Sequence, residues 1–333
     1  MHRRLTLLLV LFVLLAAFPA AAQDEPADGV FPVTIEHKYG STTIEAAPER
    51  VVSIGFTDQD PLLALGVVPV VARYWYGDAS SVILPWAEDA AGGAEPEVLN
   101  MTYGALNYEA ILALNPDLII AVGSGITQEE YDLLSQIAPT LAQSDEYVDF
   151  GMPWQETTRM IGAAVGKAAT AETLIAEVEA LFADAREQNP EFADKTVAVA
   201  YNFGEARTYG FYTGQDSRGR FFTELGLTIP EELNEIAGEF FYANLSAERI
   251  DLLDQDVLVF VGLQFAVGGR EAIEADPLIS QLDVVREGHL LFTPPEYDDA
   301  LQFSTILSLP YALEGMLPEL QAAVSGAEAT ATP

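Results

Sequence analysis

Short apolar runs alternate with amphipathic stretches along most of this chain. Runs such as 51–56 (VVSIGF) are apolar at nearly every position, which is typical of strands buried on both faces of a sheet. Stretches such as 128–138 (QEEYDLLSQIA) carry apolar residues at helical spacing. Strands are predicted at 51–56, 68–74, 118–122, 196–203 and 289–295, helices at 58–67, 128–138 and 154–165, and a hairpin at 31–45. The stretch 218–230 predicts a helix that stops at a glycine and is followed by an extended segment. The alternation predicts an α/β fold with mostly parallel sheets.

One pattern occurs twice in the chain. Residues 107–123 read NYEAILALNPDLIIAVG, and residues 246–262 read SAERIDLLDQDVLVFVG. Each copy predicts a short helix, an acidic turn and a buried strand. Aligned without gaps, the copies pair Glu109 with Glu248, Asp117 with Asp256 and Gly123 with Gly262. Two such copies indicate two similar lobes, and a cleft between lobes is a common ligand site.

A long amphipathic helix separates the two copies. It is predicted over 170–189, and at 1.5 Å per residue about 20 residues span roughly 30 Å, enough to run along both lobes. We expect the closing helices within 298–320 to break at Pro310. The predicted domains are an N-terminal lobe at 31–152, connecting helices at 153–190, a C-terminal lobe at 195–322 and a disordered tail at 323–333.

The first 22 residues predict a secretory signal peptide. Arg3 and Arg4 precede an apolar run at 5–17, and alanines at 20–22 form a small-residue cleavage site. We therefore expect cleavage after about Ala22 and a periplasmic or cell-surface protein. The chain has no cysteine, which excludes disulfides, thiolate metal sites and acylation at a lipobox cysteine.

The charge balance of the chain is strongly acidic. The formal net charge is −36, which repels nucleic acid and anionic lipid. A solvated acidic surface that keeps an exported protein soluble explains this charge, and a preference for cationic partners is the alternative. We expect a monomer that binds a small molecule and no nucleic acid.

Signals for catalysis are weak. No Gly-x-Ser-x-Gly motif occurs, and Ser124, between two glycines, is interpreted as part of a strand-end turn. After the signal peptide the histidines are His37 and His289, too few for a typical zinc site. We therefore expect no catalytic residue, no cofactor and no directly bound metal, so that any metal arrives inside a chelator.

Aromatic and arginine side chains follow the predicted strands. In open α/β sheets, ligands bind beyond the carboxyl ends of the strands. Aromatic faces with a few arginines suit a bulky, partly apolar, anionic ligand, although ordinary loop packing explains any single one of them. The predicted ligand-binding residues are Arg73, Trp75, Tyr76, Tyr103, Arg207, Tyr209, Tyr212, Arg218, Arg220, Phe265 and Tyr297.

The paired acidic residues Glu109 and Glu248 allow two interpretations. Both lie in the first turn of a predicted helix, two residues after a capping Asn or Ser. The helix dipole stabilises a carboxylate there by roughly 0.3–1 kcal/mol, which is a sufficient reason for their presence. Matched placement on two lobes also allows them to pair with arginines on a two-fold partner.

The order of these segments resembles the siderophore-type substrate-binding proteins of ABC importers. The resemblance covers about residues 31–322 and is carried by APERVVSIGFTDQDPLLALGVVPV, YEAILALNPDLII, DSRGRFFTELGLTIPEE and SAERIDLLDQDVLVFV. It implies the class III fold, two Rossmann-like lobes joined by one long helix, with limited hinge motion and a shallow cleft. Many members of that family are lipoproteins, whereas this chain lacks the cysteine.

The resemblance also implies a function. A ferric siderophore, haem or cobalamin is expected between the lobes, and the SRGRFFTELG stretch is most similar to members that take up ferric siderophores. One glutamate per lobe, here Glu109 and Glu248, is expected to dock onto arginines of the ABC permease dimer. An exported α/β hydrolase is the alternative from a different class.

Overall fold

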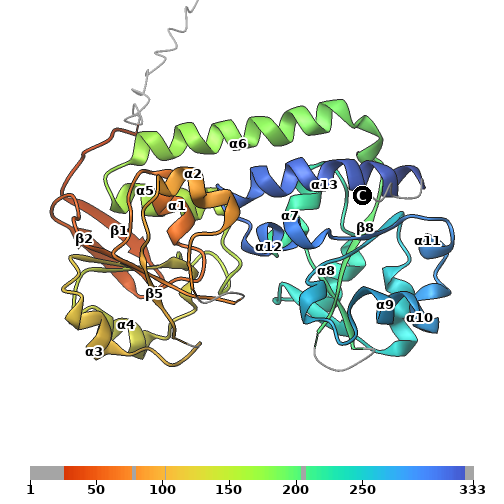
Figure 1. Cartoon of the computed structure of the whole chain (residues 1–333), viewed down its shortest axis with the longest axis horizontal. Helices are drawn as coiled ribbons and strands as arrows, with labels where there is room; N and C mark the ends of the chain where they lie inside the picture. Colours follow the sequence, from red (N-terminus) through yellow and green to blue (C-terminus); the bar gives the residue numbers. More distant parts are fainter. Residues whose placement is uncertain (1–25, 77–79, 102, 204–207, 327–333) are drawn as a thin grey trace, which may run out of the picture.

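The computed structural model describes residues 26–76, 80–101, 103–203 and 208–326. The chain forms two α/β lobes side by side, with one long helix, α6, running above both (Figure 1). This confirms the predicted fold class. The signal peptide predicted at 1–22 lies outside the described residues. No helix among the described residues is long and apolar enough to cross a membrane.

The N-terminal lobe is built on a five-stranded sheet in the order β5-β4-β3-β6-β7, in which all neighbouring strands are parallel. Its strands are β3 (Val51–Ser53), β4 (Val71–Arg73), β5 (Glu97–Leu99), β6 (Leu118–Ala121) and β7 (Thr140–Ala142), beside a hairpin of β1 (Val33–His37) and β2 (Gly40–Ile44). Its helices are α1 (Gln59–Ala64), α2 (Glu88–Ala91), α3 (Tyr108–Ala113), α4 (Gln128–Leu134) and α5 (Trp154–Ala164). Strands β3, β4, β6 and β7 are buried along their whole length, which explains their apolar runs.

The C-terminal lobe has a mixed sheet in the order β10-β9-β8-β11-β12. Strands β8 (Val197–Asn202), β11 (Val257–Phe260) and β12 (Leu290–Phe292) are parallel, whereas β9 (Tyr209–Tyr212) and β10 (Tyr242–Leu245) are antiparallel. Its helical segments are α7 (Ser217–Glu224), α8 (Glu231–Ala237), the 3₁₀ segment η4 (Ala247–Leu253), α9 (Gly269–Glu274), α10 (Pro277–Ser280), α11 (Asp283–Arg286), α12 (Pro295–Phe303) and α13 (Ser308–Ser325).

Strand β9 corrects the expectation of a ligand loop after residue 203. All four of its residues are buried, and Gly210 lies so close to the Tyr201 ring that a Cβ there would be 2.2 Å from the ring's Cζ. Position 210 of β9 therefore needs a glycine, because the ring of Tyr201, on the paired strand β8, lies directly against it. This close antiparallel packing holds the segment in the sheet instead of leaving it as a loop.

The helix that joins the lobes is α6 (Ala168–Gln188), and its 21 residues span about 31 Å. It buries Ala171, Ile175, Val178 and Phe182, and it packs against α5 on one side and α13 on the other. The Asp28 carboxylate accepts hydrogen bonds from the backbone of Ala169 and Thr170, at 3.0 and 3.2 Å. The segment before the first strand is thereby tied to the beginning of α6.

The aspartate in the acidic turn of each repeated copy, Asp117 or Asp256, has the same structural role in both lobes. The Asp117 carboxylate accepts the backbone N–H groups of Glu49 and Arg50 at 2.8 and 2.9 Å, just before β3 begins. The Asp256 carboxylate accepts the backbone N–H of Thr196 at 2.8 Å and its hydroxyl at 2.9 Å, just before β8 begins. Each aspartate therefore anchors the strand, β3 or β8, that comes first in the sequence among the parallel strands of its lobe's sheet.

The helices of the two copies differ. Asn107 caps α3 by accepting the Ala110 backbone N–H at 3.0 Å, as expected. Ser246 makes no capping hydrogen bond, which corrects the sequence interpretation, and the second copy forms the 3₁₀ segment η4. Arg249 interrupts η4 with a non-helical φ of −112°.

Two predicted boundaries near the C-terminus are also wrong. The closing helices break between Phe303 and Ser308, where Ser304 has a left-handed φ of 48°. Pro310 lies in the first turn of α13, where a missing N–H removes no helical hydrogen bond. The tail predicted from residue 323 begins later, because α13 continues to Ser325.

Candidate functional site

A cavity of about 550 Å³ lies between the two lobes. Residues that follow each of the five strands of the N-terminal sheet line it: Phe56, Trp75, Met101, Gly123 and Gln143. The C-terminal lobe contributes Ser217 and Arg218 from α7 and residues 302–306 from the junction of α12 and α13. The cavity thus lies beyond the carboxyl ends of the N-terminal strands, where open α/β sheets bind ligands.

The wall on the N-terminal lobe is aromatic. The ring centroid of Phe56 lies 5.9 Å from that of Trp75, 6.5 Å from that of Tyr103 and 6.3 Å from that of Phe150. Phe150 has a left-handed φ of 64°, unusual for a bulky side chain, and its ring lines the cavity. The four rings offer a broad apolar surface to a ligand.

The wall on the C-terminal lobe is centred on Arg218. Its Nε and Nη2 donate to the two carboxylate oxygens of Asp216, each at 2.7 Å, and its Nη1 donates to Gln302 Oε1 at 2.8 Å. Its guanidinium carbon lies 3.8 Å from the centroid of the Tyr212 ring. Burial is the largest single influence and opposes the positive charge, but the Asp216 carboxylate together with the neighbouring Tyr212 and Tyr76 raises the pKa of Arg218, which therefore stays charged.

Two buried carboxyl groups lie behind the cavity on α1. Asp58 Oδ1 accepts the backbone N–H of Gly123 at 2.8 Å, and burial raises the pKa of Asp58 to about 7. Asp60 Oδ2 accepts the Thr305 hydroxyl at 2.5 Å and the Trp86 indole N–H at 2.8 Å, and burial raises the pKa of Asp60 to about 6. The bond to Thr305 joins the two lobes directly.

Further contacts cross between the lobes beside the cavity. Arg220 of α7 donates to the backbone carbonyls of Gln215 and Gly151, the latter in the N-terminal lobe. The Glu224 carboxylate accepts the Trp154 indole N–H at 3.4 Å, and burial raises the pKa of Glu224. Together with α6, these contacts connect the two lobes beside the cavity.

The structure brings Trp75, Tyr103 and Arg218, of the residues predicted from sequence, to the cavity lining. Tyr76 and Phe265 lie beside it, their ring centroids 5.3 Å apart, and Tyr76 contacts both Trp75 and Phe303. These two residues extend the aromatic cluster without lining the cavity itself.

Other predicted residues lie elsewhere. Arg73 is 2 % exposed; its guanidinium lies 4.3 Å from the centroid of Phe56, and its Nε donates to the Met101 carbonyl at 2.8 Å. It supports the aromatic wall from within the lobe. Arg220 lies at the junction of the lobes, and Tyr212 lies under Arg218.

Two predicted tyrosines lie away from the cavity. Tyr209 of β9 donates to Asp276 at 3.0 Å and lines a second cavity of about 260 Å³. Tyr297 packs on Tyr311 between α12 and α13, with ring centroids 5.2 Å apart. Arg207 lies outside the described residues.

Sequence reasoning missed several residues of the lining. Phe56 ends the strand predicted at 51–56, so the rule that found Trp75 applies to it equally. Phe150 lies between β7 and α5, and Trp154 is the first residue of α5, so neither directly follows a strand. Gln302 and Phe303 lie at the end of α12, where the sequence shows only an amphipathic helix.

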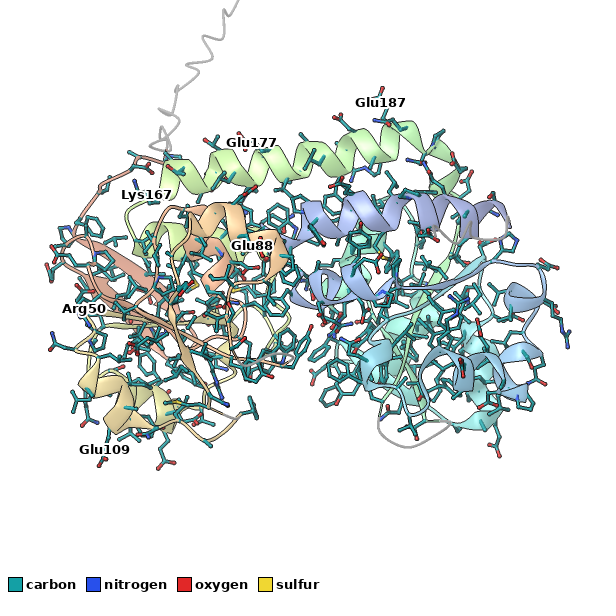
Figure 2. All side chains as sticks on the ribbon, in the orientation of Figure 1. Arg50, Glu88, Glu109, Lys167, Glu177 and Glu187 are labelled. Atoms are coloured by element: carbon teal, nitrogen blue, oxygen red, sulfur yellow. The ribbon has the colours of Figure 1, made fainter. Side chains whose placement is uncertain are left out.

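The paired glutamates lie outside the cavity. Glu109 is exposed in the first turn of α3, at the edge of the N-terminal lobe farthest from α6 (Figure 2). Glu248 is exposed near the beginning of η4. Both carboxylates are therefore accessible to a partner and separate from the ligand cavity.

The described residues offer little to catalysis or direct metal binding. Ser124 is 1 % exposed and donates to the Ala121 carbonyl at 2.6 Å, so it is a turn residue and no accessible nucleophile. His37 bonds to Thr42 within the hairpin at 2.9 Å, and His289 bonds to the Ala323 carbonyl at 2.7 Å. Among the described residues no three His, Cys, Asp or Glu side chains cluster as metal ligands would.

Comparisons with known proteins agree with this geometry. The family described as periplasmic binding protein matches residues 55–297. A probable siderophore-binding lipoprotein of Bacillus subtilis is 32% identical over 68% of this chain and 68% of its own length. The ferric enterobactin-binding periplasmic protein of Escherichia coli is 29% identical over 77% of this chain and 82% of its own length.

Solved structures of binding proteins are also similar to this chain. A periplasmic solute binding protein from Mycobacterium smegmatis is 35% identical, with a TM-score of 0.73, and the match covers 88% of this chain and 98% of that one. Streptococcus pneumoniae PiaA in complex with ferrichrome is 29% identical, with a TM-score of 0.76, over 89% of this chain and 100% of that one.

Proposed function

We propose, because the chain belongs to the periplasmic binding protein family, that it is the substrate-binding protein of an ABC importer and captures a ferric siderophore between its lobes. The observation that carries the proposal is the cavity of about 550 Å³, which has an aromatic wall on one lobe and, on the other, a mixed wall where Arg218 lies among polar and apolar side chains. A cavity of this size suits a compact chelate. The names of the relatives in B. subtilis, E. coli and S. pneumoniae support iron chelates as the class of ligand.

The protein binds its substrate and does not transform it. Its family and its relatives are substrate-binding proteins, and Ser124 is buried in a turn. The exported hydrolase therefore loses its candidate nucleophile. We assign no cofactor to the protein, since the iron enters and leaves as part of the substrate.

The site of action we propose is outside the cytoplasmic membrane. The leader at residues 1–22 has the composition of a signal peptide, and the relatives include a periplasmic protein and a lipoprotein. We propose that the mature protein is a monomer that carries the chelate to a permease. Glu109 and Glu248, one on each lobe, are the residues we propose for contact with permease arginines.

Ligand binding is testable by fluorescence, because Trp75 and Trp154 line the cavity. Purified protein is titrated with ferrichrome, ferrioxamine B, ferric enterobactin and ferric citrate, and with haem and cobalamin as competing ligand classes. Submicromolar quenching by at least one iron chelate is the expected result. Micromolar or tighter binding of haem or cobalamin, with no response to any siderophore, would overturn the siderophore assignment and keep the transport role.

Delivery is tested separately in cells that depend on this protein for uptake of the chelate. The double variant Glu109→Ala/Glu248→Ala is expected to abolish uptake and to bind ligand with unchanged affinity, because both carboxylates are exposed and lie outside the cavity. The matched control replaces two other exposed carboxylates, Glu45 and Glu187, by alanine and is expected to support normal uptake. Loss of ligand affinity in the double variant would contradict the docking role.

A further inference from the structure

We infer that the iron chelate accepted by this cavity carries a net charge of zero or above, as a ferric tris-hydroxamate does. The inference rests on the proposed function and names its substrate class. Each hydroxamate contributes one negative charge, so three of them balance Fe(III). Each catecholate contributes two, so a ferric tris-catecholate keeps three negative charges and needs a cationic site.

The cavity has one positively charged side chain among its described lining residues, and that charge is matched. Both oxygens of Asp216 contact Arg218, at 2.7 Å each, and the side chain of Asp216 is 2% exposed. The third contact of the guanidinium is with Gln302 Oε1 at 2.8 Å. The Arg218 side chain is 14% exposed, and a guanidinium held by a bidentate carboxylate adds little net positive potential to the cavity.

The other arginines near the cavity are used within the fold. Arg73 lies against the far face of the aromatic wall and bonds to the Met101 carbonyl at 2.8 Å, and it is absent from the lining. Arg220 donates to the carbonyls of Gly151 and Gln215 and is also absent from the lining. Neither residue is part of the described lining, and the Nη1 group of Arg220 is buried without a hydrogen-bond partner among the described residues.

Carboxyl groups surround the cavity on both sides. Asp58 bonds to the backbone of Gly123 and Asp60 bonds to the hydroxyl of Thr305, and both Gly123 and Thr305 line the cavity. Asp216 lies behind Arg218 on the opposite wall. A trianion in the cavity would be repelled by those of these carboxyl groups that are ionised, and Asp58, with a pKa raised to about 7, carries only part of a charge at neutral pH.

The remaining lining favours neutral or cationic ligands. The faces of Phe56, Trp75, Tyr103, Phe150 and Phe303 carry negative electrostatic potential, which attracts cations and disfavours anions. Asn100, Gln143 and Thr157 offer uncharged donors.

The side-chain amide of Gln302 offers a hydrogen-bond donor to the cavity. The residue is 4% exposed and lines the cavity, and its Nε2 makes no hydrogen bond of standard geometry within the described residues. The amide lies close enough to Asp298 to help lower the pKa of that carboxyl, against the larger opposing effect of burial. Asp298 engages one N–H of this amide, so an uncharged oxygen acceptor of the ligand, such as an amide carbonyl, would satisfy the other.

The charge class is tested by titrating the full mature chain with neutral ferrichrome, cationic ferrioxamine B and trianionic ferric enterobactin. We expect at least one tris-hydroxamate to bind about 100-fold more tightly than ferric enterobactin, with an affinity that changes little between low and high salt. Ferric enterobactin binding as tightly as both tris-hydroxamates, or more tightly, would overturn the inference and leave the proposed function intact. A protein that binds none of the three and no ferric citrate would overturn both.

A variant tests the cause. Asp216→Asn removes the carboxylate charge from Arg218 and keeps the oxygen that caps α7. We expect the affinity for ferric enterobactin to rise about 10-fold and that for ferrichrome to change less than about threefold. The matched control is Glu274→Gln, which removes the partner of Arg270 on the surface and is expected to change neither affinity. If Asp216→Asn unfolds the protein, Gln302→Leu is used instead and is expected to weaken ferrichrome binding about 10-fold. Unchanged affinity for ferric enterobactin in folded Asp216→Asn, or for ferrichrome in folded Gln302→Leu, would contradict the assignment.

Discussion

The two lobes share one sequence pattern, and comparing them shows which part of it determines structure. Asp117 and Asp256 both anchor the first strand of the parallel sheet through backbone N–H groups. The helices that precede them differ, since α3 is capped by Asn107 and η4 has no side-chain cap. The pattern therefore encodes the attachment of strands, and the helix in each copy follows its local sequence.

The lobes also differ in how they reach the ligand cavity. The N-terminal lobe lines it with residues that follow all five of its strands. The C-terminal lobe lines it with α7 and the junction of α12 and α13, and no residue directly after β8, β11 or β12 is part of the described lining. Similar lobes thus provide chemically different walls, one mainly aromatic and one that mixes polar residues and Arg218 with Phe241, Phe303 and Ile306.

The largest expected difference between the lobes is in their response to pH. Burial raises the pKa of Asp58 in the N-terminal lobe to about 7, whereas an unfolded aspartate titrates near 3.9. The folded state binds this proton more tightly, so the contribution to stability is complete below about pH 4 and is lost as the pH rises through 7. Relative to wild type, Asp58→Asn is expected to gain on the order of 4 kcal/mol in free energy of unfolding between pH 4 and pH 8.

Urea unfolding at a series of pH values checks this expectation. Asp298 of the C-terminal lobe is the internal comparison, because burial also raises its pKa, while the Thr293 hydroxyl and the Gly262 N–H stabilise its ionised form. Asp298→Asn is expected to show a pH effect of the same sign and smaller size. Parallel pH profiles for wild type and Asp58→Asn would show that Asp58 has no such role.

The same two aspartates are expected to differ when they are truncated at pH 8. Asp298→Ala removes the acceptor of the Gly262 N–H and of the Thr293 hydroxyl, at 2.9 and 2.5 Å, and is expected to lower the free energy of unfolding by about 3 kcal/mol. Asp58→Ala also removes a poorly solvated charge and is expected to lower it by about 1 kcal/mol. Chemical denaturation measures both values, and a larger loss for Asp58→Ala would reverse the comparison.

The strand anchors should behave alike in the two lobes. Asp117→Ala removes two hydrogen bonds before a central strand, and Asp256→Ala removes two from Thr196 and an exposed contact from Lys195 at 3.4 Å. Because the exposed ion pair adds little, each variant is expected to lower the free energy of unfolding by about 2 kcal/mol. Asp145→Ala, at an exposed loop position, is the control and is expected to change it by less than about 0.5 kcal/mol. A clear inequality between the two anchors would show that the copies have diverged at this position as well.

The smallest expected effect concerns the helix caps. Asn107→Ala is expected to lower the free energy of unfolding by about 1 kcal/mol, because it removes the bond to the Ala110 N–H. Ser246→Ala is expected to change it by no more than about 0.3 kcal/mol, since its side chain makes no capping bond. Thermal unfolding compared at one pH separates the two, and equal losses would mean that Ser246 caps η4 in solution.

The sequence predicts the parallel strands well, because strands buried on both faces need continuous apolar runs. It does not predict β9, because Tyr209, Phe211 and Tyr212 are held by pairing with β8 and by contacts that come from distant parts of the chain. The break before α13 is missed for a related reason. Pro310 is a helix breaker only in a helix interior, and its position in the first turn depends on where α12 ends.

The site is predictable to the extent that strand ends determine it. Trp75 is predicted in this way and Phe56 is equally predictable, whereas Tyr103 is predicted from the loop before the first repeat helix. Gln302 and Phe303 line the cavity because α12 docks against the other lobe, which no local pattern reveals. The pairing of Arg218 with Asp216 is visible in the sequence as two opposite charges two residues apart, and it changes the role expected for that arginine.

The helix α6 has a consequence for the thermodynamics of ligand capture. It joins the lobes as one uninterrupted element, and the bond from Thr305 to Asp60 connects them again beside the cavity. The two walls are therefore ordered relative to each other when the chain folds, and an arriving ligand loses its own freedom without having to restrict that of the lobes. Association with such a preorganised cavity is governed by diffusion and desolvation, so differences in affinity between chelates should arise mainly in their dissociation rates.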